Sequence, residues 1–380
     1  MIKIAKWFNN HQSPICLTLD DLSDVYVKPM GLENKKIMPF FDWGFNLDKD
    51  GSLYKFFVDS VIKKNPEIKV TFFLPLGIHG SPNPNSGYEV ENHGLKNRDF
   101  LKFIKNIQDG YKFEIAAHGI NHCKYIDVNK PEIRNNVIHE LIYINTNKFK
   151  KRIKQIIDSL YQDYGIEIVG GRSPCYENKM LKPKDFSEMD LLYWNFDYSN
   201  LKSIPPKIID DLVIMPSNIS GSLFNNNPTS STLKNILREI RKANKFSKLM
   251  KIYKSGNPII IAEHFIFLRT DGRFQSPSLY SDVDSINEIY ALFKRADVWH
   301  ASCAEIARYF ESYKHSSIKQ LDNKRYELIY NGKYEKAFIT VISDHRKLKN
   351  VKASEIIKGY YKQGDWIYNT IDAGMYEEIE

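Results

Sequence analysis

Short apolar runs alternate with helical patterns along most of the 380-residue chain. The continuous runs at 15–19, 70–74, 113–117 and 259–262 are typical of strands that are buried on both faces. Between them, apolar residues recur with a period near 3.6, as expected for helices that cover a sheet. This alternation predicts an α/β fold, specifically a (β/α) barrel with a largely parallel sheet.

The other predicted elements follow the same two patterns. We expect helices over 53–61, 98–108, 132–163, 231–253, 283–294 and 302–313, and strands over 166–169, 191–196, 211–215 and 298–300. Ser52 precedes the first helix and can cap it, because its side-chain oxygen accepts from an exposed N–H of the first turn.

The pattern changes after about Lys314. Residues 326–330, 337–342 and 366–368 are typical of antiparallel strands, and Asn331-Gly332 is a hairpin signal between the first two. We therefore expect a barrel over 1–313 and a small β-rich module over 314–380, with no catalytic constellation in the module.

Composition narrows the classes of function. Hydrophobic residues make up 42% of the chain, enough for one large core and a small second domain. Aromatic residues reach 13%, which fits a carbohydrate-facing protein and also an ordinary tyrosine-rich one. The net charge of +8 could steer an anionic substrate, although lysine is abundant throughout. Without a sustained arginine and aromatic stripe, no nucleic-acid partner is expected.

The distribution of apolar residues and cysteines predicts a cytoplasmic protein. The first ten residues lack the apolar core of a signal peptide, and no run approaches the ~18 apolar residues of a membrane span. The cysteines, which are scattered and read as reduced thiols, are Cys16, Cys123, Cys175 and Cys303. The oligomeric state stays open.

Polar residues follow two of the apolar runs. Asp20 and Asp21 end the run at 15–19, and His118 and His122 follow the run at 113–117. Residues just past the carboxyl ends of parallel strands face the active site. One aspartate and two imidazoles suit a divalent metal with an open position for water, with the second aspartate beside that water. Taken alone, the aspartate pair is more often a turn or a cap, and the histidine pair more often solvated.

Two further segments strengthen the case for a site. At 168–176 an apolar strand runs into a glycine pair, then Arg172 and Pro174. An arginine there can bind a carboxylate through two hydrogen bonds and keep it ionised. The alternative without a function is a surface arginine in a turn. The run at 259–262 leads to His264, which is placed for a general acid or, alternatively, for a core histidine.

Taken in order, these segments resemble the five motifs of the polysaccharide deacetylases with NodB homology, carbohydrate esterase family four. The resemblance covers about residues 10–312. Gly119 stands where serine or threonine is common in the second motif, and Cys175 is an extra residue before the tyrosine of the third. The matching segments are Thr18-Leu-Asp20-Asp21, His118-Gly-Ile-Asn-His122, Arg172-Ser-Pro174-Cys-Tyr176, Trp194-Asn-Phe-Asp197-Tyr-Ser199 and Ile259-Ile-Ile-Ala-Glu-His264.

The resemblance implies a distorted, seven-stranded barrel and metal-dependent N-deacetylation of an amino sugar. Asp21, His118 and His122 would bind the divalent ion, with Zn²⁺ as the default and Co²⁺, Fe²⁺, Mn²⁺ or Ni²⁺ open. Asp20 would act as the general base, kept ionised by Arg172.

Further roles follow from the same resemblance. His264 would protonate the leaving amine, oriented by Asp197. Tyr176, Pro174 and Trp194 would contact the substrate or its oxyanion, with a backbone N–H near Tyr176 as the donor. The substrate would be a sugar unit made in the cytoplasm, such as a nucleotide- or lipid-linked intermediate of a polysaccharide.

Two rival functions remain. A glycoside hydrolase needs two carboxylates that flank a glycosidic bond, and adjacent Asp20 and Asp21 would point to different faces. A non-catalytic carbohydrate-binding relative would keep the barrel but lose the residues that activate water. The segment over 23–66 is an insertion with an aromatic cluster at 40–45, which could cover one end of the barrel or form a substrate-facing lid.

Overall fold

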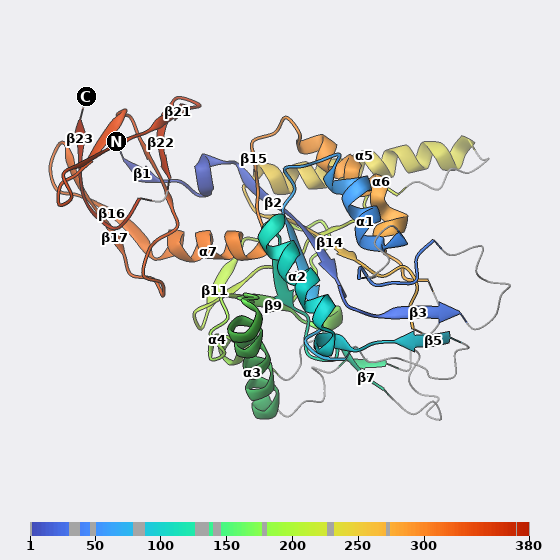
Figure 1. Cartoon of the computed structure of the whole chain (residues 1–380). Coiled ribbons are helices and arrows are strands. Elements are labelled where there is room, and N and C mark those ends of the chain that lie inside the picture. Colours follow the sequence, from blue (N-terminus) through green and yellow to red (C-terminus); the bar gives the residue numbers. More distant parts are fainter. Residues whose placement is uncertain are drawn as a thin grey trace.

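A curled sheet wrapped by helices forms the body of the protein, and a β-rich module lies to one side of it (Figure 1). The computed structural model describes residues 2–29, 39–45, 51–78, 88–125, 137–139, 146–176, 181–225, 232–270, 274–369 and 371–379.

The barrel sheet follows the predicted architecture. Seven strands, from β12 to β14 in spatial order, run parallel to their neighbours. The short strand β13 continues this series, β11 pairs antiparallel with β12 at the other edge, and β15 pairs with β2. The spatial order is β11 (Lys207–Ile209), β12 (Leu212–Ile214), β10 (Tyr193–Asn195), β9 (Gly170–Arg172), β6 (Glu114–Ala117), β4 (Val70–Leu74), β2 (Ser13–Asp20), β14 (Ile259–His264) and β13 (Ile219–Ser220), with β15 (Val298–His300) beside β2.

Strand β2 lies between β4 and β14 in this sheet, and all eight of its residues are buried. That burial on both faces explains why the strand reads as a continuous apolar run rather than as an alternating one. In the ladder, Asp20 is in register with His264 of β14 on one side and with Phe73 of β4 on the other. The carboxyl ends of these strands therefore lie at one edge of the sheet, where the sequence predicts the site.

Helices pack around the sheet as the periodicity predicts. They are α1 (Leu53–Phe57), α2 (Arg98–Gly110), α3 (Thr146–Tyr164), α4 (Pro183–Ser187), α5 (Thr232–Lys254), α6 (Leu279–Phe293) and α7 (Cys303–Lys314). Ser52 caps α1, because its side chain accepts from the Lys55 N–H at 3.1 Å, and the helix continues as a π-helical turn over Val58–Ile62. Within the described part of the chain, no helix has both the length and the apolarity needed to cross a membrane.

Two predicted boundaries were wrong. The helix expected over 132–163 begins only at Thr146, and Val137–His139 instead forms β8, which pairs with β7 (Cys123–Tyr125). Residues 131–136 and 140–145 lie outside the described residues. The strand expected over 166–169 is β9, which starts at Gly170. A Cβ on Gly170 or Gly171 would lie 2.1–2.2 Å from the aromatic rings of β10, so the glycines let these two strands pair closely.

The β-rich module contains two antiparallel sheets. One consists of β1 (Lys3–Ile4), β18 (Thr340–Ser343), β22 (Asp365–Asn369) and β21 (Tyr360–Lys362), and the other of β16 (Ser316–Gln320), β17 (Arg325–Tyr330), β23 (Gly374–Ile379), β19 (Lys347–Asn350) and β20 (Glu355–Lys358). The N-terminal strand β1 thus joins the module, as Figure 1 shows. The exact boundary at residue 313 stays a prediction.

The hairpin predicted at Asn331-Gly332 does not form, because β17 and β18 belong to different sheets. Helix α7 holds the turn instead. The carboxylate of Glu311 accepts from the Lys333 N–H and from the Tyr330 hydroxyl, both at 2.9 Å, and the Asn331 N–H donates to the His315 carbonyl.

The described part of the insertion packs onto the barrel. Trp43 is 2% exposed and donates its indole N–H to the Leu268 carbonyl at 2.8 Å. The buried carboxylate of Asp42 accepts from the backbone N–H groups of Gly44 and Leu53. These contacts favour the covering role for the aromatic cluster at 40–45. A short ribbon of β3 (Tyr26–Pro29) and β5 (Tyr88–Glu91) lies alongside.

Candidate active site

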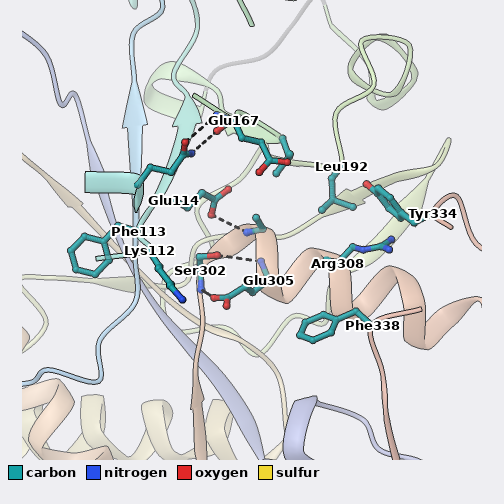
Figure 2. Close-up of a pocket in the computed structure, with 13 residues that line it drawn as sticks. Lys112, Phe113, Glu114, Glu167, Leu192, Ser302, Glu305, Arg308, Tyr334 and Phe338 are labelled. Carbon is teal, nitrogen blue, oxygen red and sulfur yellow. Dashed lines mark hydrogen bonds between the residues drawn. The ribbon is translucent and has the colours of Figure 1, made fainter. Parts of the chain in front are cut away.

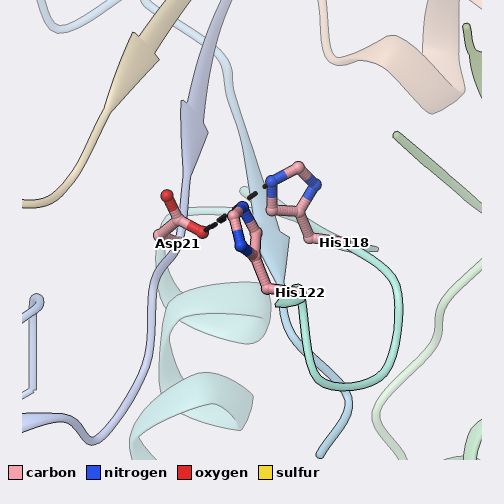
Figure 3. Close-up of side chains that lie close together, drawn as sticks. All are labelled: Asp21, His118 and His122. Carbon is pink, nitrogen blue, oxygen red and sulfur yellow. Dashed lines mark ion pairs between the residues drawn. The ribbon is translucent and has the colours of Figure 1, made fainter. Parts of the chain in front are cut away.

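Asp21, His118 and His122 converge at the carboxyl edge of the sheet (Figure 3). One potential ligand atom from each lies within 4.8 Å of the others. The Oδ1 atom of Asp21 is 3.7 Å from Nε2 of His118 and 3.4 Å from Nε2 of His122. Asp21 and His118 are fully buried, while His122 is partly exposed. The sequence-predicted ligand set is thus brought together by two strands that are far apart in the chain.

Local backbone geometry explains how these side chains reach one point. Asp21, Gly119 and His122 all have left-handed backbones, with φ of 69°, 70° and 60°. The segment from His118 to His122 is therefore a tight loop rather than a helical turn. The left-handed position of Gly119 is one that glycine occupies without steric cost.

Hydrogen bonding prepares His118 as a ligand. Its Nδ1 lies 3.1 Å from the Arg172 carbonyl, an acceptor that fixes the proton on Nδ1 and leaves the Nε2 lone pair toward Asp21. Burial lowers the pKa of His118, and the positive charge of Arg172 acts in the same direction, although Asp20 and Asp21 oppose it. A neutral imidazole oriented by a second hydrogen bond is the arrangement that metal-binding histidines adopt. Two imidazoles and a carboxylate therefore fit a divalent cation.

Asp20 lies next to this cluster and is held by Arg172. The guanidinium Nη1 donates to Asp20 Oδ1 at 2.6 Å, and Nη2 donates to the hydroxyls of Thr18 and Ser217 at 2.8 and 2.7 Å. Arg172 is completely buried, and its guanidinium also covers the ring of Phe73 at 4.2 Å. A charge-assisted hydrogen bond of this length fixes the orientation of the Asp20 carboxylate.

Two residues of this arrangement were given no role from the sequence, although Thr18 was named as part of the first motif. Thr18 lies two positions before Asp20 on β2, so both side chains are on the same face, and this spacing was a usable signal. Ser217 lies between β12 and β13 and comes to Arg172 only through the tertiary fold.

The third motif differs from the expectation. A backbone N–H near Tyr176 is predicted to serve the oxyanion, but the N–H of Tyr176 itself donates to the Ser173 carbonyl at 2.9 Å and is therefore engaged within its own turn. Cys175 and Tyr176 have φ of 48° and 57°, so the extra residue is accommodated by a left-handed turn. Pro174 is buried and begins this turn. The ring of Tyr176 faces Arg172, whose guanidinium carbon is 5.2 Å from the ring centroid.

The other predicted residues lie in different surroundings. Trp194 is 0% exposed, stacks on Phe186 with ring centroids 4.2 Å apart, and donates its indole N–H to Ser173. Its side chain thus belongs to the core rather than to a substrate-facing surface. Asp197 is exposed, and no hydrogen bond or ion pair between described residues joins it to His264. His264 itself is in register with Asp20 at the end of β14.

A buried acidic pair behind His264 was missed by the sequence reasoning. Glu263 Oε1 accepts from the His264 N–H at 2.8 Å. Burial, followed by the nearby carboxylate of Asp282, raises the pKa of Glu263 well above its usual value. Asp282 is 2% exposed and accepts from the side-chain amide of Asn225. The pair fixes the backbone that carries His264.

A pocket lies between the barrel, α7 and the module (Figure 2). It contains Glu114, the first residue of β6, together with Arg308 and Tyr334. The guanidinium of Arg308 covers the Tyr334 ring at 3.4 Å. Because His118 follows the other end of β6, this pocket is at the opposite edge of the sheet from the metal-ligand cluster.

Comparisons with known proteins show likeness at the level of structure. No protein-family model matches the chain, and no curated protein matches it. A Mycobacterium smegmatis protein provisionally described as a polysaccharide deacetylase is 16% identical, with 82% of this chain and 94% of that one covered and a TM-score of 0.47. The Puue allantoinase is 14% identical, with 80% and 92% covered and a TM-score of 0.43.

Peptidoglycan deacetylase PdaC from Bacillus subtilis is 12% identical, with 78% of this chain and 90% of that one covered and a TM-score of 0.35. The structural neighbours thus include polysaccharide and peptidoglycan deacetylases. At these identities and TM-scores, the assignment of a function has to rest on the residues of the site.

Proposed function

We propose that this protein is a metal-dependent hydrolase that removes an N-acetyl or related acyl group from an amino sugar. The observation that carries the proposal is the pairing of two arrangements at one edge of the sheet. One is the ligand set of Asp21, His118 and His122, and the other is the ion pair of Asp20 and Arg172. Sugar as the substrate class is supported by the order of the five sequence motifs.

Each residue of the site has a chemical task in this proposal. A divalent ion held by Asp21, His118 and His122, Zn²⁺ by default, would lower the pKa of water and polarise the amide carbonyl. Asp20 accepts the proton of the attacking water, and Arg172 keeps it ionised and aimed. His264 donates a proton to the departing nitrogen, which otherwise leaves as a poor amide anion.

The two rivals are weaker on the same geometry. A glycoside hydrolase needs one carboxyl group to act as an acid and another as a nucleophile or base. Here Asp20 is bound to a buried guanidinium and Asp21 faces two imidazoles, so neither is placed as a proton donor. A non-catalytic binding protein has no need of a buried ion pair next to a ligand set.

The experiment is acetate release from a panel of N-acetylated amino sugars. The purified protein is loaded with one divalent ion at a time and assayed on free, nucleotide-linked and oligomeric substrates. We expect acetate to appear with at least one ion, and to disappear after chelation and after Asp20→Asn. New reducing ends without acetate would instead support glycoside cleavage, and saturable sugar binding without either product would support the binding role.

A cytoplasmic biosynthetic intermediate, nucleotide- or lipid-linked, is the substrate we propose to test first. The panel distinguishes these linkages directly, because each carries the same acetamido group on a different carrier. A clear preference for a polymer over both carriers would contradict this part of the proposal and leave the reaction type unaffected.

A further inference from the structure

The long helix α5 takes no part in the site, yet it concentrates the charge of the protein. Its 23 residues include eight lysines or arginines and one glutamate, a net charge of +7. The whole chain has a net charge of +8. Figure 1 shows the N-terminal part of α5, in yellow, extending beyond the neighbouring helices at the edge of the barrel.

The two halves of α5 are packed differently. In the C-terminal half, Leu249 and Ile252 are buried in the core at 0% and 1% exposure. In the N-terminal half, Ile236, Leu237 and Ile240 are 53%, 45% and 60% exposed. Residues three and four apart lie on the same side of a helix, so these three side chains form one exposed apolar face. We call this surface the α5 apolar face.

Cations on the other side of the helix are turned toward the protein. Lys242 pairs with Glu288 at 2.5 Å and lies 5.7 Å from the ring centroid of Phe224. Lys245 donates to the Leu223 carbonyl at 2.7 Å. Residues two positions apart in an α-helix are separated by about 200° around the helix axis. Ile240 therefore lies on the opposite side from Lys242 and faces away from the protein. The helix therefore exposes an apolar face beside its exposed cations.

We propose that the α5 apolar face docks the protein onto the surface of an anionic membrane. Isoleucine and leucine side chains would enter the boundary between headgroups and acyl chains. The exposed side chains of Arg241, Lys248 and Lys251 would reach the lipid phosphates. The binding is peripheral and places the helix in the plane of the interface. The inference does not depend on the catalytic assignment.

A second copy of the chain or a nucleic acid could also cover the α5 apolar face, but the charge of the helix argues against the first and its apolar side chains argue against the second. A second copy of the chain would bring another helix of charge +7 against the first, which is repulsive. A nucleic acid would pair with the exposed cations alone and would leave the exposed side chains of Ile236, Leu237 and Ile240 without an apolar partner. An anionic lipid surface is complementary to both features at once.

The experiment is co-sedimentation of the full-length protein with vesicles. Phosphatidylcholine vesicles with phosphatidylglycerol are compared with pure phosphatidylcholine, each at low and high salt. We expect binding to the anionic vesicles that weakens with salt. The double variant Ile236→Ser with Ile240→Ser should bind at least about tenfold more weakly. Ile356→Ser is the matched control, because Ile356 is 52% exposed on β20 of the module.

Three outcomes would overturn the proposal. The first is equal affinity of the double variant and the wild type for anionic vesicles, or no binding by either. The second is a dimer in sedimentation velocity that the double variant loses, which would assign the face to a second copy. The third is RNA binding of the same strength as vesicle binding and unchanged by the double variant. Acetate release from soluble substrates should be unchanged in the double variant. A negative result in the vesicle experiment would therefore leave the proposed function untouched, and a negative result in the acetate assay would leave the membrane proposal untouched.

Discussion

A buried titratable residue lies at each end of strand β6. The two residues differ in whether nearby side chains form hydrogen bonds with them. Glu114, at the start, accepts from the Thr71 hydroxyl and the Tyr193 hydroxyl at 2.7 Å and from the Ala304 N–H at 2.9 Å. His118, just after the end, lies 3.7 Å from the Asp21 carboxylate, which is longer than a hydrogen bond.

Burial and altered pKa values alone therefore do not locate a functional site in this fold. Glu114 is 9% exposed, and burial raises its pKa to about 7, a value that could suggest catalysis. Yet its oxygens are used by three donors that join β4, β10 and α7. At the other end, nitrogen and oxygen atoms point to a common centre at distances suited to an ion between them. A hydrogen-bond network in which each polar group is paired makes the fold more rigid. A set of metal-ligand atoms that converge on one point offers a binding site instead.

The largest effect is expected from removing a ligand at the carboxyl edge. His118→Ala or His122→Ala should lower metal affinity by more than about a hundredfold, beyond the 10- to 100-fold typical of outer-shell partners. Acetate release should fall to background. Metal content by mass spectrometry checks this, and circular dichroism verifies the fold. His345→Ala, on a 42%-exposed histidine of the module, is the control. Full metal content in both site variants would refute the assignment.

Asp20→Asn should lower turnover by about 10²–10⁴-fold while metal content stays the same. The amide cannot accept the proton of water, although it can still accept from Arg172. The measurement is kcat for acetate release together with metal content. Asp284→Asn makes the same chemical change at an exposed position of α6 and should have little effect. Near-wild-type kcat in Asp20→Asn would remove Asp20 as the base.

His264→Ala should affect substrates according to their leaving groups. An amine needs a proton to depart, whereas an aryl ester leaves without one, so kcat should fall about 10²-fold on the amide and far less on the ester. The ratio of the two rates is the measurement. Equal losses on both substrates would indicate that His264 positions the substrate and does not protonate it.

The parts of the fold and of the site that could be predicted are those whose sequence pattern lies within one short segment. The apolar runs of β2, β6 and β14 and the polar residues that follow them predicted the barrel and the convergence of Asp21 with His118 and His122. Ser217 and the pair of Glu263 with Asp282 were not found, because their partners come from distant segments.

Orientation was the other limit. The pattern around Trp194 could not tell a side chain that packs on α4 from one that faces the substrate. The left-handed turn that engages the Tyr176 N–H depends on φ angles that no composition rule reveals. Helix α5 was predicted over 231–253, but its outward apolar face follows only from its packing.

The smallest expected effect on catalysis is at Glu114, and it tests the contrast between the two ends of β6. The pKa of Glu114 is raised from its ordinary value of 4.5 to about 7 in the folded protein, so its contribution to stability is complete below pH 4.5 and is lost as the pH rises through 7. A difference of that size corresponds to about 3 kcal/mol.

Glu114→Gln removes the titration and keeps the shape. In urea unfolding, the wild type should therefore lose stability between pH 5 and pH 8 relative to Glu114→Gln, while kcat of the variant stays within about threefold of the wild type. A variant with a parallel stability profile but a collapse of kcat would move the functional centre to the opposite edge of the sheet, because Glu114 would then act on the substrate and not on the fold.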